Sequence, residues 1–130
     1  MPHIDAHIFN KRGVKKELTL VLDEGDSILD SVKRAMGEHN VPEVNVEEAE
    51  GTIKEGAINF FERSSYRNAQ LRNSRVIRVS GNFKLSYGEL YGTMKIFTYD
   101  KPPLHGTLVK GAAAQGFTLK LSFVELVDAK

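Results

Sequence analysis

The sequence predicts an α+β domain in which one main helix flanks a largely antiparallel β-sheet. Three observations support this prediction. One segment, residues 28–36, carries apolar side chains at helical spacing, whereas five or more segments have the composition or alternation of strands. No linker or internal repeat divides the 130 residues, a length typical of one domain with its own core. We therefore expect a single domain over residues 15–130, preceded by an N-terminal arm over residues 1–14.

The helix is the most clearly marked element. Asp26 or Ser27 is placed to cap it by accepting a hydrogen bond from a first-turn amide. Gly37 and Asn40 predict its end, and Pro42 prevents its continuation. The apolar stripe of this helix consists of Ile28, Leu29, Val32, Ala35 and Met36.

The remaining structure is expected to be extended. Residues 117–123 alternate cleanly between apolar and polar side chains, which is typical of a strand with one buried face. The strand over residues 75–85 is expected to bend at Gly81. Residues 63–74 are polar, rich in Asn, Ser and Gln, and predict a long loop. The expected strands cover residues 17–22, 44–46, 52–61, 75–85, 90–99 and 117–127.

Composition excludes several classes of protein. There are no cysteines, which excludes disulfides and thiolate metal sites. No apolar run approaches the roughly 18 residues of a membrane span, and the N-terminus lacks the order of a signal peptide, so we expect a cytoplasmic protein without a membrane partner. The formal net charge is only +1, so binding to nucleic acid would require a local basic patch.

The N-terminal arm contains two histidines, His3 and His7, at the spacing of two metal ligands on one helix face. Pro2 and the terminal position instead favour an irregular or strand-like arm with surface histidines.

An acidic block precedes a basic block. Five glutamates between residues 43 and 55 are accompanied only by Lys54, whereas no carboxylate occurs between Glu62 and Glu89. If the two blocks form neighbouring strands, opposite charges offset each other across the ladder, at roughly 0.2–1 kcal/mol per pair. If they lie on separate faces, the basic block forms an anion-attracting patch. The first arrangement is favoured.

The basic block is the best candidate for a functional surface. Arginines at this spacing can contact phosphates, and an interleaved tyrosine can stack on a base. The last two arginines fall in an expected strand, where pairing within or between subunits is the alternative. The candidate nucleic-acid contacts are Arg63, Tyr66, Arg67, Arg72, Arg75 and Arg78.

Four segments, in this order and spacing, carry a resemblance to a known family. They are Glu-Gly-Asp-Ser-Ile-Leu at 24–29, the strand ending in Ser-Gly-Asn at 71–82, Glu-Leu-Tyr-Gly-Thr at 89–93, and His-Gly-Thr-Leu-Val-Lys-Gly at 105–111. Together they resemble the plants-and-prokaryotes-conserved (PPC) domain, which plant proteins carry alongside AT-hook motifs and which bacteria and archaea have as a stand-alone protein. The likeness covers roughly residues 15–127. It implies an antiparallel sheet flanked by helices and assembly as a homotrimer.

The same resemblance bears on metal binding. Some prokaryotic members of the family bind a metal through a His-x-His pair and a turn histidine. Carried over by position, the pair falls on Tyr91 and Thr93, and the turn histidine on Thr107. Neutral hydroxyls are poor zinc ligands, and His105, two residues from the third position, does not make a site alone. We therefore expect no metal and no other cofactor.

Three functions remain open, and one of them is a purely structural or protein-interaction trimer. The first, which the family resemblance implies, is a homotrimer with a DNA-associated regulatory role, and it is expected to be non-enzymatic because no nucleophile elbow or phosphate-loop motif is present. The alternative is a small-molecule-binding or vestigial metalloenzyme-like protein with a pocket at the subunit interface. His105, after two prolines, could act there as acid, base or ligand, although hydrogen bonding within its turn is the favoured role. The residues of this expected pocket are Tyr91, Thr93, His105 and Thr107.

Overall fold

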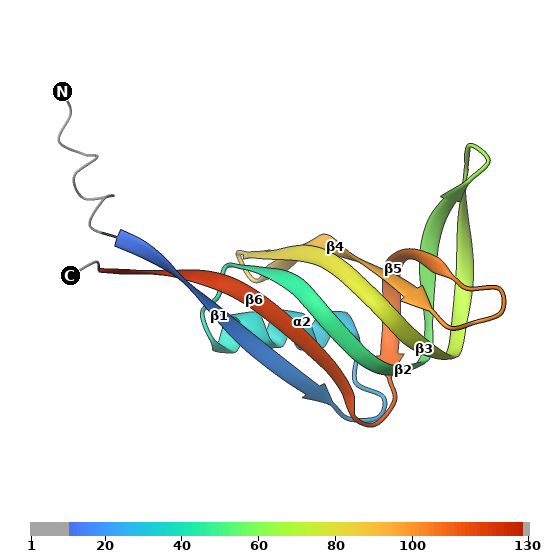
Figure 1. The fold of residues 1–130 in the computed structure, drawn as a ribbon, viewed down its shortest axis with the longest axis horizontal. Coiled ribbons are helices and arrows are strands. Elements are labelled where there is room, and N and C mark those ends of the chain that lie inside the picture. Colours follow the sequence, from blue (N-terminus) through green and yellow to red (C-terminus); the bar gives the residue numbers. More distant parts are fainter. Residues whose placement is uncertain (1–10, 129–130) are drawn as a thin grey trace.

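The computed structural model describes residues 11–128, which form one domain containing six strands and one helix (Figure 1). All of the strand pairings in this range are antiparallel, which confirms the predicted α+β class with a largely antiparallel sheet. The trimeric state stays a prediction. The elements are β1 (Lys11–Leu22), α2 (Ile28–Glu38), β2 (Glu43–Glu62), β3 (Ser65–Ser86), β4 (Glu89–Thr98), β5 (His105–Ala113) and β6 (Phe117–Asp128).

Strand β2 organises the sheet because it is shared between two groups of strands. One edge of β2 pairs with β3. The other edge pairs with β6 over residues 45–50 and then with β5 over residues 53–59. Since β3 pairs with β4 and β4 pairs with β5, strands β2 to β5 close into a ring, and β6 and β1 extend the sheet beside the first half of β2.

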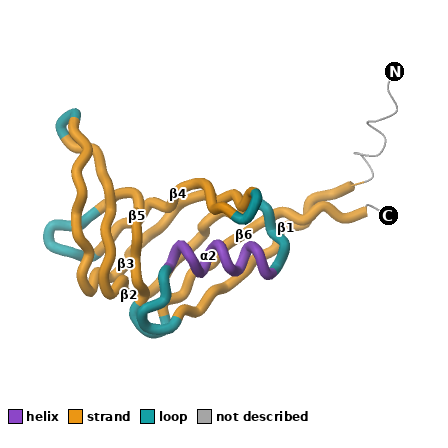
Figure 2. The backbone as a smooth tube through the Cα atoms, turned by 180° about the vertical axis from the view of Figure 1, so that it is seen from behind, coloured by secondary structure: helices purple, strands orange, loops and turns teal. Residues whose placement is uncertain are grey.

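Helix α2 lies against one face of the sheet (Figure 2). The Ser27 side chain accepts a hydrogen bond from the amide of Asp30 at 3.3 Å, which confirms the expected N-cap. The helix passes through Gly37 to Glu38, and Asn40, with φ of 54°, is the left-handed residue that ends it. Gly37 therefore does not terminate the helix. The buried helix residues are Ile28, Val32, Ala35 and Met36.

The core lies between this helix and the inner face of the ring. The largest of its fully buried strand side chains come from β2, β3, β4 and β6. These side chains are Ile53 and Ile58 of β2, Leu71 and Phe83 of β3, Met94 and Ile96 of β4, and Phe117, Leu119 and Leu121 of β6, with Leu108 of β5 at 5% exposure.

The prediction of a long loop over residues 63–74 is wrong. Strand β2 continues to Glu62, and β3 begins at Ser65. Arg63 and Ser64 form the two-residue turn between them, with φ of 49° and 64°. Such a turn matches the twist of the paired strands and usually contains Gly or Asn-Gly, so its sequence gave no turn signal here. The segment also lacks apolar alternation because both of its faces are largely exposed.

Two smaller expectations also differ from the structure. His105 and Thr107 lie in strand β5 and not in a turn. In β3, the register shift relative to β4 lies between Val76 and Arg78 and not at Gly81. The expected turn rests on the preceding prolines and the expected bend on Gly81. Gly81 instead marks close backbone approach, because a Cβ there would overlap the carbonyl oxygen of Thr93.

The acidic and basic blocks are neighbouring strands, as favoured from the sequence. In the β2–β3 ladder Glu43 lies opposite Lys84, and Glu55 lies opposite Arg72. His3 and His7 lie outside the described residues. Within residues 11–128, no helix is both long and apolar enough to cross a membrane.

Candidate nucleic-acid interface

The tip of the β2–β3 hairpin projects away from the rest of the domain (Figure 1). The last pairing of β2 with β5 is Asn59 with Thr107, so among residues 11–128 only β3 pairs with β2 beyond that point. We call residues 59–68 the hairpin arm. A two-stranded ribbon of this kind buries little of its own surface, and its side chains are available to a partner on both faces.

An aromatic pair lies near the tip of the hairpin arm. Phe61 and Tyr66 are directly opposite each other in the ladder. Their ring centroids are 5.1 Å apart with an interplanar angle of 71°, the edge-to-face arrangement that aromatic pairs prefer. The two residues are 63% and 83% exposed, so this pair contributes little to the core and presents aromatic surface to solvent.

Side-chain amides continue the same face toward the base of the arm. Asn68 donates from Nδ2 to Oδ1 of Asn59 at 2.9 Å. Gln70 donates from Nε2 to Oδ1 of Asn68 at 3.0 Å. This face therefore carries an aromatic pair followed by a row of exposed amide donors and acceptors.

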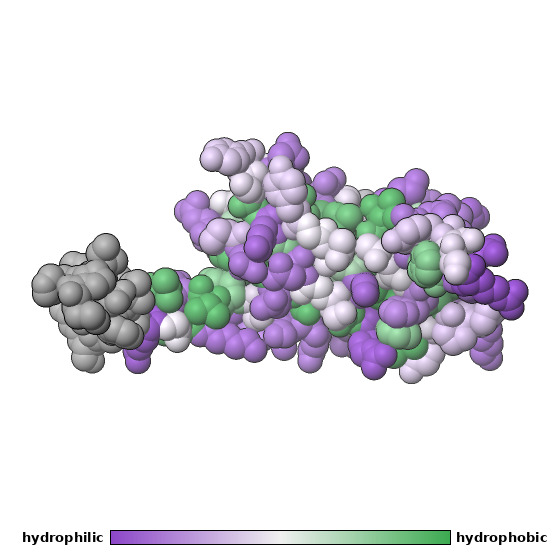
Figure 3. Space-filling view, turned by 90° about the horizontal axis from the view of Figure 1, so that it is seen from above, coloured by the Kyte–Doolittle hydropathy of each residue, from purple (hydrophilic) through white to green (hydrophobic). Residues whose placement is uncertain are grey.

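The arm is basic. Arg63 lies in the turn, and Arg67 lies two residues into β3, with its Nε 3.9 Å from Oε1 of Glu62. That ion pair is about half exposed on both sides, so it contributes little and leaves Arg67 able to contact another anion. Glu62 is the one carboxylate in residues 59–68, and the two arginines leave a net charge of +1. Strongly hydrophilic side chains gather at this end of the molecule (right in Figure 3).

The structure thus groups three of the six predicted nucleic-acid contacts, Arg63, Tyr66 and Arg67, and separates the other three. Arg72 lies at the base of the arm, opposite Glu55. The remaining two predicted contacts, Arg75 and Arg78, lie farther along β3, on the rim of a hollow in the sheet.

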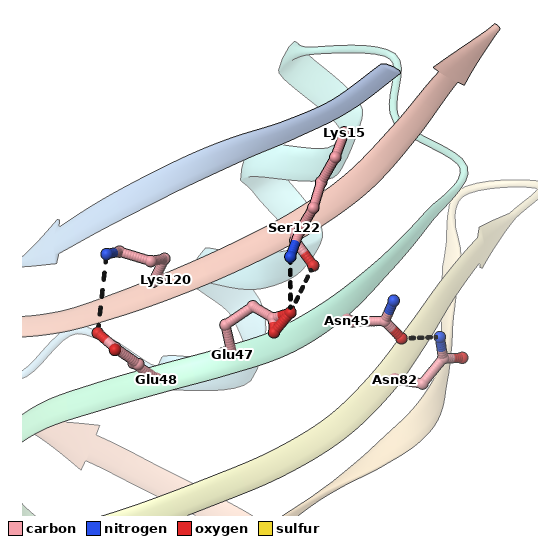
Figure 4. A network of polar contacts seen from close by, with 7 residues as sticks. All are labelled: Lys15, Asn45, Glu47, Glu48, Asn82, Lys120 and Ser122. Atoms are coloured by element: carbon pink, nitrogen blue, oxygen red, sulfur yellow. Dashed lines mark hydrogen bonds and ion pairs between the residues drawn. The ribbon is translucent and has the colours of Figure 1, made fainter. Parts of the chain in front are cut away.

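The hollow has a volume of about 450 Å³ and was not predicted from the sequence. It lies beside residues 47–50 of β2 and residues 75–79 of β3. Nearby polar contacts include Nζ of Lys120 at 3.7 Å from Glu48, and Glu47 accepting hydrogen bonds from Lys15 at 3.5 Å and Ser122 at 3.1 Å (Figure 4). No local sequence signal marks the hollow, because it depends on how two strands separate.

The four residues of the predicted pocket lie on β4 and β5. Tyr91 and Thr93 are exposed on β4, opposite Lys84 and Asn82 of β3. On β5, His105 is exposed and Thr107 is half-buried. None of the four lines any of three hollows in the described part of the chain, so the expected pocket at the subunit interface stays a prediction.

His105 has a well-defined neighbour. Its ring stacks on Phe97 with centroids 3.7 Å apart and an interplanar angle of 8°. The guanidinium of Arg78 lies 4.5 Å from the centroid of the same Phe97 ring, a cation–π contact. Since Phe97 pairs with Arg78 on one side and with His105 on the other, the three side chains form a row across β3, β4 and β5.

The described residues offer no ligand set for a metal. Within residues 11–128, no group of three or more His, Asp or Glu side chains is arranged to hold an ion. The three positions that the family resemblance assigns to histidines hold Tyr91, Thr93 and Thr107, whose neutral hydroxyls do not suit zinc.

Comparisons with known proteins find this fold among solved structures. No family model matches the sequence, and no curated protein is a relative by sequence. Solved structures do match. A plant- and prokaryote-conserved (PPC) protein from Pyrococcus horikoshii superposes with a TM-score of 0.69 at 19% identity, covering 92% of this chain and 85% of that one.

Two further structures have the same fold. A candidate DNA-binding protein from Ralstonia eutropha JMP134 matches with a TM-score of 0.68 at 17% identity, over 82% of this chain and 76% of that one. A metal-containing protein from Archaeoglobus fulgidus matches with a TM-score of 0.68 at 15% identity, over 88% of this chain and 81% of that one. The resemblance to the PPC domain is confirmed at the level of the fold, and identities this low establish the fold alone.

Proposed function

We propose that this protein is a non-enzymatic, cytoplasmic homotrimer that associates with DNA in a regulatory role and contacts it through the hairpin arm. The observation that carries the proposal is the grouping of Arg63, Tyr66 and Arg67 on an exposed two-stranded ribbon. The name of the Ralstonia structure with this fold, a candidate DNA-binding protein, supports the same class of partner.

The shape of the arm suits duplex DNA. The major groove of B-DNA admits a two-stranded β-ribbon as well as an α-helix. The turn residue Arg63 and the nearby Arg67 would contact phosphates, and such contacts provide most of the affinity. The amides of Asn59 and Asn68 are of the type that reads adenine edges, and they would approach the bases from the ribbon face.

Trimer formation would strengthen a weak arm. A net charge of +1 on one arm supports only modest attraction to phosphate, and the formal net charge of the whole chain is also only +1. Three arms on one particle would make the second and third contacts intramolecular, so that the combined affinity exceeds that of one arm by orders of magnitude.

A gel-shift titration across salt concentrations tests the proposal. The variant carries Arg63→Ala, Arg67→Ala and Arg72→Ala. A matched control removes three positive charges from β1 through Arg12→Ala, Lys15→Ala and Lys16→Ala. We expect the arm variant to lose at least about tenfold in affinity and to have a shallower salt dependence, by about one unit of slope per lost phosphate contact, while the control keeps both.

Two outcomes would overturn this assignment. One is undetectable binding of the unmodified protein to duplex DNA at low salt. The other is an equal loss of affinity in the arm variant and the β1 control, which would mean that total charge, and not the arm, determines binding. Mass measurement in solution tests the trimer separately, since a stable monomer would contradict it.

A further inference from the structure

A row of stacked side chains lies on the outer face of the ring, across β3, β4 and β5. The Phe97 ring has a neighbour on each side, because Arg78 lies opposite it on β3 and His105 lies opposite it on β5. The guanidinium is 4.5 Å from the Phe97 centroid, and the imidazole is parallel to Phe97 at 3.7 Å. Within residues 11–128, no second aromatic ring stacks on His105, which is exposed. The row therefore ends in an aromatic ring that is open to a partner.

The aromatic pair of the hairpin arm lies on the same outer face. Directly paired residues of neighbouring strands point to the same side of a sheet, and so do residues two apart on one strand. Thr107 is paired with Asn59 where β2 leaves β5. His105 and Phe61 each lie two residues beyond this pair, so they occupy corresponding positions on one face. Since Phe61 is in turn opposite Tyr66, aromatic surface extends from β5 onto the arm.

The strands that carry this face are strongly basic. Residues 63–113 span β3, β4 and β5 and contain nine lysines and arginines but only two carboxylates. One of the two, Glu89, is six residues from Lys95 along β4, or roughly 20 Å. The other, Asp100, accepts a hydrogen bond from the Thr98 hydroxyl at 2.6 Å. The glutamates at the hollow belong to β2 and are separated from β4 by β3.

Lys95 provides a positive charge next to the stacked row. Its side chain is exposed two residues before Phe97 on β4, and Thr107 lies opposite it on β5. Among the ion pairs of residues 11–128, none includes Lys95. The outer face thus combines exposed rings with a cation that is available to an anionic partner.

This chemistry favours nucleic acid with unpaired bases. Neither Lys95 nor the exposed rings line any of three hollows in residues 11–128, so the face is open and suits an extended ligand. Aromatic side chains stack on the faces of bases, and a positive surface attracts the backbone, which is how proteins bind single strands without sequence preference. In a duplex the base faces are covered by neighbouring pairs, and proteins reach only the base edges in the grooves. A row of exposed rings therefore recognises bases outside a duplex.

We propose that single-stranded DNA binds along this outer face. Successive bases stack on His105 and on the aromatic pair of the arm. Lys95 contacts a phosphate, and Phe97 supports the imidazole from its other side. The choice of DNA rests on the proposed function, whereas the form of the DNA and the use of β4 and β5 go beyond it.

Fluorescence anisotropy with the full-length protein and a labelled oligothymidine of about 12 nucleotides tests the proposal, since single-strand sites cover roughly 4–16 nucleotides. We expect His105→Ala and Phe61→Ala each to raise the Kd at least about fivefold, because each removes one stacking ring. His105→Phe keeps a ring and should bind within about twofold of the unmodified protein. His39→Ala is the matched control, because His39 is an exposed histidine at the end of α2, and it should leave the Kd unchanged.

The salt dependence tests the phosphate contact. Lys95→Gln should make the slope of log Kd against log salt shallower by about 0.7, the value for one phosphate contact on a single strand. Arg34→Gln removes an exposed charge from α2 and should keep the slope. Lys95 and His105 are both exposed, so their variants should remain folded.

Several results would contradict the proposal. They are no binding of oligothymidine at low salt, an unchanged Kd in His105→Ala or Phe61→Ala, and equal losses in His105→Ala and His105→Phe. Tighter binding of oligouridine would assign the face to RNA instead. A lower mass in solution for His105→Ala than for the unmodified protein would make the face a contact between copies.

A duplex of the same length separates this inference from the proposed function. His105→Ala should keep full affinity for the duplex while it loses affinity for oligothymidine. If the unmodified protein did not bind the duplex, the proposed function would fail, and the effect of His105→Ala on oligothymidine binding would still decide this inference. A loss of affinity for both forms in His105→Ala would overturn the assignment of this face to unpaired bases.

Discussion

Two neighbouring parts of the β2–β3 ladder have the same strands and the same register but opposite surroundings. At residues 53–58 the ladder is part of the closed ring, and Ile53 and Ile58 of β2 are fully buried. A few residues farther along, Phe61 and Tyr66 are 63% and 83% exposed. The comparison teaches that pairing alone does not decide which residues hold the fold together. Burial by a third strand and a helix decides it, and the residues beyond that support are free for contacts with a partner.

The largest expected effect comes from comparing two alanine substitutions on the same strand, one at a buried and one at an exposed apolar residue. Ile58→Ala removes a fully buried side chain from the ring and should lower the free energy of unfolding by about 3–4 kcal/mol. Phe61→Ala removes an even larger side chain from the arm but should cost less than about 1 kcal/mol, because only the edge-to-face contact with Tyr66 is lost. Urea unfolding measures both. Equal losses would mean that the arm is packed as tightly as the ring.

A smaller effect is expected from a methyl group added to strand β4 of the ring. Gly92 has φ of 116°, and a Cβ there would overlap the carbonyl oxygen of Asn82 on β3. Gly92→Ala should therefore destabilise by roughly 2–3 kcal/mol, since backbone must move in addition to the strained φ. Gly88 provides the control, because it also has positive φ, 77°, but no atom within 4 Å of the added Cβ. Gly88→Ala should cost only about 1 kcal/mol, and a loss as large as that at Gly92 would contradict the steric explanation.

Helix α2, which covers the ring and not the arm, allows a third and weaker test. Ser27→Ala removes the side-chain acceptor for the Asp30 amide and should lower the free energy of unfolding by about 1 kcal/mol. Ser86→Ala, an exposed serine at the end of β3, is the matched control and should change it by less than about 0.5 kcal/mol. Ser27→Ala should leave the DNA affinity measured by gel shift unchanged, since α2 lies against the ring and not against the arm.

The same contrast explains what could be predicted from the sequence. The helix and the regular strands of the ring carry apolar residues at a fixed period, and the period records burial. The hairpin arm carries no such period because both of its faces are largely exposed, and its Arg63-Ser64 turn lacks glycine. The sequence therefore predicts a loop over residues 63–74, which include the turn and the β3 side of the arm, although it marks Arg63, Tyr66 and Arg67 as functional candidates.

Long-range pairing limited the site prediction in a different way. Arg75 and Arg78 were grouped with the arm because they are close to it in sequence. The structure places them at the opening between β2 and β3, and that opening arises from register shifts against two other strands. Such shifts depend on partners that are distant in the chain, and no local composition reports them.

The smallest stability effect should also separate folding from function within the arm. Ser64→Gly places glycine at φ of 64°, where it is unstrained, and should stabilise the turn by about 0.5–1 kcal/mol. Hydrogen exchange of the arm amides is the appropriate measurement, because the arm can open without the ring. Arg63→Asn combined with Ser64→Gly creates the preferred turn sequence and should protect the arm at least as well, but it also removes a proposed phosphate contact. Its DNA affinity should fall while Ser64→Gly alone keeps full affinity. If both variants bound DNA equally, arm rigidity and not the Arg63 charge would be the property that DNA binding requires.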